Sequence, residues 1–274
     1  MKPQISEFSF GYALTEALVR DGSTPVIAAP LFPSLYQEGQ AGGGYDLMLN
    51  MGMGFAFLQF KLSDRMVKRN AYECANGGFT PPFFRMPLRP KHLSNQHEML
   101  IELANQGHWV FYAAPAFHTQ DEFNDAYINK TLVNRTFFIG PLEIGALPDD
   151  EDHHVTFDAS YNSKVYSSTP RNVGGRMGRE WVANLEEDTR SRPRRMLTRE
   201  AAEGATREVT ELLSRFVRTR ERLRLEQRLA AQEEHPLAQL ATVSRTFLDC
   251  ELLILRSLPS TLDEGEVGPG EQAE

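Results

Sequence analysis

The segment from Gly54 to Ser63, GFAFLQFKLS, constrains the fold of this chain more than any other. Successive side chains of a strand point to opposite faces, so the apolar residues of this segment occupy both faces. A strand that is apolar on both sides needs cover on both sides, which is typical of the sheet in an α/β protein. Gln59 and Lys61 share one face of this strand, so the sequence places an amide and an ammonium group in a region with the composition of a core.

A second apolar run, YDLMLNM at 45–51, precedes this strand and is separated from it by Gly52–Gly54. We expect the two runs to pair as a hairpin that turns at these glycines. The pairing would place Asp46 near Gln59 and Lys61 at one end of the hairpin. A solvent-facing polar stripe on an amphipathic hairpin is the alternative interpretation.

A helix is expected from Glu7 to Arg20, with Ser6 as its N-cap. On a helical wheel Glu7 lies near the centre of the apolar face, which is formed by Phe10, Gly11, Leu14 and Leu18. An ionised carboxylate in that position is unfavourable unless it is paired or binds a metal. Alternatively, Glu7 is half-solvated in the first turn and interacts with the helix dipole.

The rest of the chain predicts alternating strands and helices. In order, the pattern favours a strand at 24–32, an irregular segment at 64–93, a helix at 95–106, a strand at 108–117, a polar helical piece at 120–134, strands at 136–145 and 153–160, a linker at 161–178, and helices over 179–258 that include a long one at 197–234. We therefore expect an α/β domain at 1–165, a linker and helical region at 166–258, and a disordered acidic tail at 259–274.

Charge and cysteine content give weaker constraints. The 274 residues carry a net charge of −8, but the stretch 190–228 holds 12 arginines against 6 glutamates, so the overall sign does not exclude nucleic acid. Cys74 and Cys250 form no CxxC motif, which favours reduced thiols and a cytoplasmic protein. No apolar run is long enough for a membrane helix, so we expect no membrane partner.

Two further groups of side chains are candidates for substrate binding. Arg65, Lys68 and Arg69 lie in a basic segment with interspersed aromatic residues, which suits a nucleic-acid strand or an ordinary loop packed on the core. Gln96 and His97 open the expected helix at 95–106 and could contact a phosphate or a metal-bound water. Capping of the helix by these two polar residues is the alternative.

The order of these elements resembles that of the PD-(D/E)xK nuclease superfamily. It consists of a helix with an inward Glu, a strand with Asp, and a strand with a polar residue two positions before Lys. The resemblance covers residues 6–117 and implies the restriction endonuclease-like fold, an αβββαβ core with a mixed sheet. It implies that Glu7, Asp46 and Gln59 hold Mg²⁺, for which Mn²⁺ substitutes, and that Lys61 positions or activates a water. The implied function is an endonuclease that hydrolyses DNA, with a role in bacterial antiviral defence.

The sequence departs from this pattern at two positions. Tyr45, not proline, precedes Asp46, and Gln59 stands where a second acid is usual, as in QxK members of the superfamily. The loss of that acid weakens metal affinity, so Glu7 would have to compensate. The rival hypothesis is a non-catalytic binding or assembly module, in which residues 179–258 form a homo-oligomer or bind a protein partner.

Overall fold

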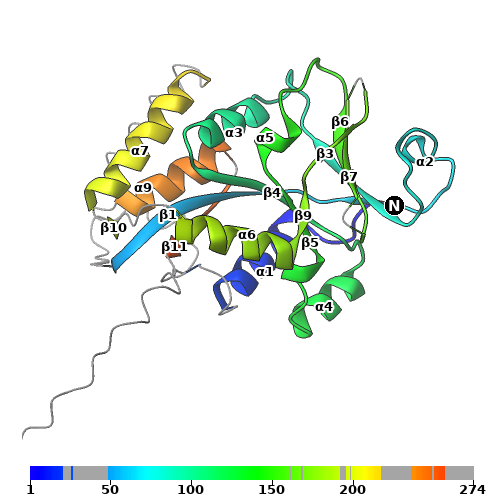
Figure 1. Ribbon diagram of the computed structural model, residues 1–274, viewed down its shortest axis with the longest axis horizontal. Helices are drawn as coiled ribbons and strands as arrows, with labels where there is room; N and C mark the ends of the chain where they lie inside the picture. Colours follow the sequence, from blue (N-terminus) through cyan, green and yellow to red (C-terminus); the bar gives the residue numbers. More distant parts are fainter. Residues whose placement is uncertain are drawn as a thin grey trace, which may run out of the picture.

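A mixed β-sheet crosses the centre of the computed structural model, which describes residues 1–20, 26, 49–160, 162–167, 169–191, 196–197, 199–216, 236–248 and 250–256 (Figure 1). Within these residues the central sheet has six strands. In order across the sheet they are β10 (Met196–Leu197), β1 (Leu49–Phe60), β4 (Trp109–Pro115), β5 (Thr136–Ile139) and β9 (Arg176–Met177), with β11 (Glu251–Arg256) paired to β1. The α/β class and the mixed sheet expected from the sequence are confirmed.

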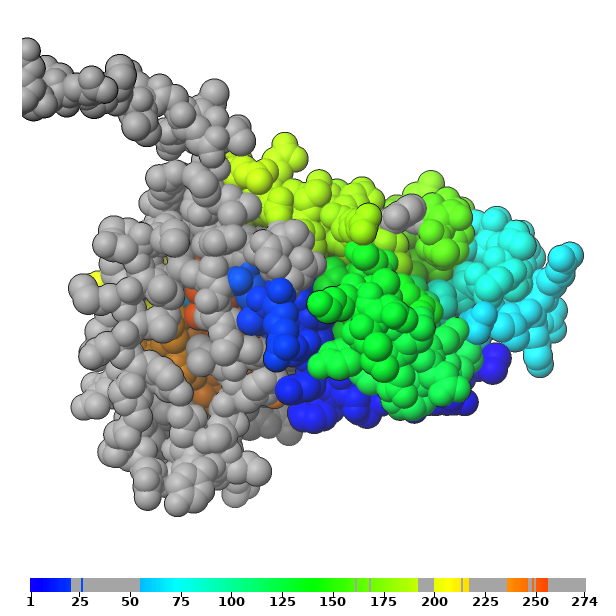
Figure 2. Space-filling view, turned by 90° about the horizontal axis from the view of Figure 1, so that it is seen from below, coloured from blue at the N-terminus to red at the C-terminus, as the bar shows by residue number. Residues whose placement is uncertain are grey.

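Helices cover both faces of this sheet (Figure 1). One face carries α3 (Gln96–Asn105), α7 (Arg199–Ser214) and α9 (Pro236–Val243), and the other carries α1 (Glu7–Arg20) and α6 (Gly178–Ser191). The shorter helices are α2 (Tyr72–Gly77), α4 (Gln120–Ile128), α5 (Pro141–Ile144), and the single turns Val133–Arg135 and Ser244–Leu248. Figure 2 shows α1 and α4 side by side on the underside of the molecule.

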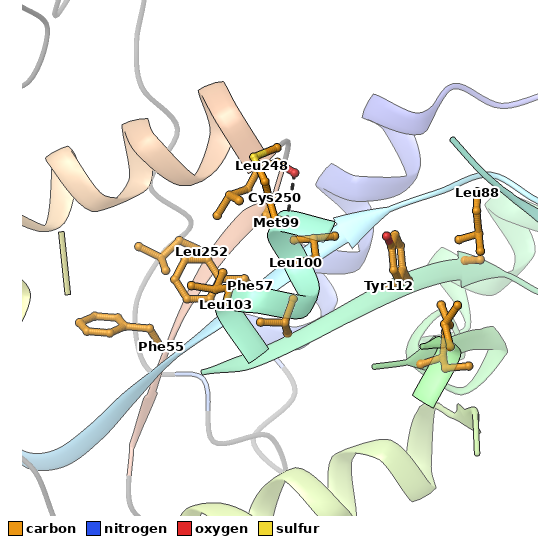
Figure 3. Close-up of a cluster of buried hydrophobic side chains, with 14 of the residues drawn as sticks. Phe55, Phe57, Leu88, Met99, Leu100, Leu103, Tyr112, Leu248, Cys250 and Leu252 are labelled. Carbon is orange, nitrogen blue, oxygen red and sulfur yellow. Dashed lines mark hydrogen bonds between the residues drawn. The ribbon is translucent and has the colours of Figure 1, made fainter. Parts of the chain in front are cut away.

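The alternation of β1 explains these two layers. Phe55 and Phe57 pack with α3 in one buried cluster, whereas Ala56 and Leu58 belong to the cluster under α1. Figure 3 shows the first cluster, where Phe57 lies against residues of α3 and β11. Full burial of a Phe or Leu side chain contributes roughly 1.5–3 kcal/mol, so a two-sided strand is a major source of stability.

A second, antiparallel sheet packs against the same core. Its strands are β2 (Asp64–Met66), β3 (Phe83–Leu88), β6 (His153–Phe157), β7 (Ser163–Tyr166) and β8 (Arg171–Asn172). Phe137 of β5 stacks on Phe157 of β6 with ring centroids 4.2 Å apart. The two sheets therefore share one hydrophobic core.

The two helices with the clearest local signals are confirmed. The helix expected from Glu7 is α1, and its predicted apolar face is buried. Gly11 allows α1 to approach the sheet, because a Cβ at this position would lie 2.5 Å from the Phe60 ring. The helix expected at 95–106 is α3, which ends where Gly107 adopts a left-handed φ of 88°.

The predicted hairpin turn at Gly52–Gly54 is wrong. β1 continues through these glycines as one strand, since β10 and β11 pair in succession along the same edge of β1. Glycine accepts the extended conformation as readily as a turn, so tertiary pairing decides its conformation. The start of the first expected run, including Asp46, lies outside the described residues.

Two segments expected to be irregular instead contain strands. The segment 64–93 contains β2, α2 and β3, and the expected linker 161–178 contains β7 and β8 of the second sheet and β9 of the central sheet. The expected domain boundary after residue 165 falls inside β7. These strands are short and gain their hydrogen bonds from partners distant in sequence, so local patterns signal them weakly.

The C-terminal region is helical only in part. The expected long helix at 197–234 is observed as α7 up to Ser214, and residues 217–235 lie outside the described part of the chain. β11 is a strand, not a helix, and it pairs with β1 from Leu58↔Glu251 to Met53↔Arg256. Of the strand expected at 24–32, Val26 is described and bridges Leu255. The tail at 259–274 is not described.

Among the described residues, every helix is too short or too polar to cross a membrane. Cys74 and Cys250 are both free thiols, with Cys250 buried.

Candidate functional site

Gln59 and Lys61 lie at the carboxyl end of β1, beside the parallel strand β4. Gln59 is fully buried and Lys61 is 5% exposed. The backbone N–H of Lys61 donates to the carbonyl of Ala113 at 2.9 Å, which continues the pairing with β4 past the end of β1. Ligands of open α/β sheets commonly bind at the carboxyl ends of parallel strands, so this position suits a functional site.

Gln96, in the first turn of α3, connects the two polar residues of β1. Its Nε2 donates to Gln59 Oε1 at 2.6 Å, and its Oε1 accepts from Lys61 Nζ at 3.2 Å. Gln96 Nε2 also donates to the carbonyl of Leu248 at 3.1 Å. Gln96 is itself 3% exposed, so the three side chains form a buried polar network, which we call the Gln–Lys network. The structure thus unites Gln59, Lys61 and Gln96 of the sequence-predicted residues.

An acidic cleft adjoins the Gln–Lys network through Cys250. The sulfur of Cys250 lies 3.9 Å from Gln59 Oε1 and 3.4 Å from the carbonyl oxygen of Leu248, which is its nearer acceptor. The cleft has a volume of about 190 Å³ and is lined by Glu7, Phe8, Gly11, Tyr12, Phe60, Arg245, Cys250 and Glu251. Glu7 therefore faces this cleft, on the side of the sheet that α1 covers, while Gln59 contacts α3 on the other side.

Glu251 is the second carboxylate of the acidic cleft, and sequence reasoning missed it. Glu251 is 3% exposed, and its Oε2 forms an ion pair with Arg245. Burial raises the pKa of Glu251 above its ordinary value, although the Arg245 charge and hydrogen bond act in the opposite direction. The sequence predicted a helix in this region, so it did not place Glu251 beside β1. The apolar run ELLILR was the available signal of a buried strand.

The structure favours a structural role for His97. Its Nε2 lies 2.8 Å from the carbonyl of Gly145 and therefore donates to it, and its Nδ1 accepts from the Tyr112 hydroxyl at 2.9 Å. Burial lowers the pKa of His97, against the opposing effect of the Gly145 hydrogen bond. Both ring nitrogens bind the protein itself, so His97 ties α3 to the turn after α5.

The basic residues expected to bind substrate lie in and just after β2. Arg65 forms an ion pair with Glu122 at 3.4 Å. Lys68 and Arg69 are exposed in the turn before α2. Lys68 and Arg69 are therefore the accessible residues of this basic group.

A second buried polar cluster, which the sequence did not reveal, lies in the second sheet. Glu73 of α2 is fully buried, and its Oε1 accepts from Arg85 Nε at 2.7 Å and from His154 Nε2 at 3.0 Å. Burial raises the pKa of Glu73, but hydrogen bonds and the charges of Arg85 and His154 outweigh it, and the net pKa is lowered. Burial and the Arg85 charge lower the pKa of His154. We interpret this cluster as the link that holds α2 on β3 and β6.

The lowered pKa values of His97, His154 and Glu73 predict that the protein loses stability in mild acid. His97 and His154 have folded-state pKa values below the ordinary 6.5, so below that pH the unfolded chain binds more protons than the folded chain. The free energy of unfolding should fall by about 1 kcal/mol per histidine between about pH 7.5 and about pH 5.5. The lowered pKa of Glu73 adds a further loss below its ordinary value of 4.5.

Urea unfolding at the two pH values measures this effect. His97→Asn should be less stable at the higher pH and should show a smaller difference between the two. His92→Gln is the control, because His92 is exposed. An equal pH dependence in all three proteins would refute the assignment.

Comparison with known protein families, curated proteins and solved structures finds no match to this chain. Within the described residues, no three His, Cys, Asp or Glu side chains are grouped so that they could hold a metal by themselves. A metal at this site would therefore need the amide oxygen of Gln59, or a residue outside the described part of the chain such as Asp46.

Proposed function

We propose that this protein is a metal-dependent nuclease that hydrolyses phosphodiester bonds, with DNA as its substrate, on a restriction endonuclease-like core. The observation that carries the proposal is the Gln–Lys network at the carboxyl end of β1, in which the Lys61 ammonium donates to the Gln96 amide and Gln96 in turn donates to Gln59. The parallel pairing of β1 with β4, with α3 between them in sequence, agrees with the order that the resemblance implies. A cytoplasmic location and a role in antiviral defence are parts of the same proposal.

The donor chemistry of the site fits Mg²⁺ or Mn²⁺. An amide oxygen has two lone pairs, and Gln59 Oε1 accepts from Gln96 Nε2 at 2.6 Å, with the sulfur of Cys250 3.9 Å away. Displacement of the thiol would leave an oxygen ligand of the hard type that Mg²⁺ prefers. Glu7 lines the cleft that Cys250 also lines, and Asp46 would supply the remaining carboxylate.

Lys61 is the residue we assign to the chemical step. When bound, the metal ion supplies Lewis-acid stabilisation of the charge on the scissile phosphate. The Lys61 ammonium donates hydrogen bonds to a phosphate oxygen or to the attacking water, and its burial strengthens this interaction relative to bulk solvent. Gln96 fixes the position of Nζ, so it acts as a positioning residue.

Cleavage assays with and without metal test this function. Supercoiled plasmid, single-stranded DNA and RNA should be incubated with purified protein and Mg²⁺, Mn²⁺ or EDTA. We expect nicking of the plasmid with either metal and none with EDTA. Absence of cleavage of all three substrates with both metals would overturn the nuclease proposal.

A non-catalytic module is the second candidate, and the amide at Gln59 favours it, because an acid would bind a metal more tightly. This candidate predicts that the protein binds nucleic acid or a partner without cleavage. Part of its proposed contact region at 179–258, however, packs inside the protein. Val209 and Leu212 of α7, and Leu240 of α9, are buried in the core against the central sheet.

A further inference from the structure

Glu251 and Glu7 reach the same cleft from the two ends of the chain. Glu7 is in the first turn of α1, and Glu251 opens β11. Both line the acidic cleft, together with Arg245 and Tyr12. The pairing Leu58↔Glu251 sets Glu251 beside the residue that precedes Gln59.

The two oxygens of Glu251 have different surroundings. Oε2 pairs with Arg245, whose side chain is one-third exposed. Oε1 is buried and has no hydrogen-bond partner among the described residues. A buried carboxylate oxygen without a partner is unfavourable, because it has lost its hydrogen bonds to water and gained none in return. A bound cation would satisfy this oxygen.

We propose that Glu251 is a ligand for a divalent cation of the Mg²⁺ or Mn²⁺ type, which it holds in the acidic cleft together with Glu7. The inference rests on the proposed function and adds to its site a residue from β11. Such cations take carboxylate oxygens and keep several waters, which a cleft of about 190 Å³ accommodates. Arg245 leaves Oε1 to the cation, orients the carboxylate and offsets part of the unfavourable burial of its charge.

β11 sets Glu251 directly opposite Leu58, so its side chain lies on the face of the sheet that α1 covers, with Glu7, while Gln59 lies on the face that α3 covers. The C-terminal strand thereby belongs to the site as well as to the sheet. A chain without β11 would lack both this proposed ligand and a strand of the central sheet.

Mn²⁺ binding, measured by isothermal titration calorimetry on the full chain, tests the inference directly. Glu251→Gln preserves the shape of the side chain and should weaken Mn²⁺ binding by at least about tenfold. Glu187→Gln makes the same chemical change at an exposed position of α6 and should leave the affinity unchanged. Glu251→Asp retains the charge and should recover part of the affinity lost in Glu251→Gln.

Terbium luminescence locates the ion. Tb³⁺ bound in the acidic cleft would be excited through Tyr12, so Mn²⁺ should displace it and quench the emission. Tyr12→Phe should reduce this emission without the loss of Mn²⁺ affinity expected of Glu251→Gln. Thermal unfolding in EDTA confirms that each variant is folded.

The outcomes separate the cation site from the nuclease. Equal Mn²⁺ affinity in the wild type and Glu251→Gln, or no binding by the wild type, would overturn the inference. Binding that depends on Glu251 in a protein that cleaves no nucleic acid would support the cation site and refute the nuclease. Undiminished nicking by Glu251→Gln would support the nuclease and refute the role of Glu251.

Discussion

Lys61→Met is expected to reduce metal-dependent nicking of plasmid DNA by at least about 100-fold, while the protein stays folded. Methionine keeps the length and the apolar stem of lysine but removes the ammonium group. Loss of a charge donor that acts in the transition state lowers the rate of cleavage without a matching effect on DNA binding. The rate of conversion of supercoiled to open-circular plasmid in Mg²⁺ measures the effect.

The fold should tolerate this substitution, because replacement of a buried charge by an apolar side chain is often neutral for stability. Gln96 Oε1 loses the hydrogen bond from Nζ, which lowers the free energy of unfolding by about 1 kcal/mol. Lys68→Met is the matched control, since Lys68 is exposed in the segment that follows β2. Wild-type cleavage by Lys61→Met, or equal losses in the two variants, would refute the assignment of Lys61.

A chain that ends at residue 235 is expected not to fold. It lacks α9 and β11, and with them the buried residues Leu252, Leu253, Ile254 and Leu255. Truncation of one buried Leu to Ala lowers the stability by about 2–5 kcal/mol. The loss of several such residues, and of the backbone hydrogen bonds to β1, exceeds the total stability of about 5–15 kcal/mol that a typical domain has.

Circular dichroism and urea unfolding measure this prediction. The shortened chain should show no cooperative transition, whereas a chain that ends at residue 258 keeps β11 and should unfold cooperatively. Leu253→Ala gives a graded version, with an expected loss of about 2–5 kcal/mol. A cooperative transition of wild-type stability in the chain that ends at 235 would contradict this prediction and show that the C-terminal region is a separable unit.

Local sequence patterns were sufficient for the elements whose signals lie within a few turns. The apolar spacing of α1 and the left-handed Gly107 after α3 set the bounds of those helices. The alternation in β1 was sufficient to place Gln59 and Lys61 on one buried face. The mixed α/β class followed from these elements.

Tertiary structure decided the rest, since strand pairing and ion pairs join residues that are distant in the chain. The residues 52–54 form a continuous strand instead of a turn because β10 and β11, from the far end of the chain, hydrogen-bond to them. A short apolar run such as ELLILR has no period that separates a buried strand from a helix. The acidic cleft is therefore absent from any local pattern: it exists only where β11 brings Glu251 to the side of β1 and α1 brings Glu7 to the same cleft.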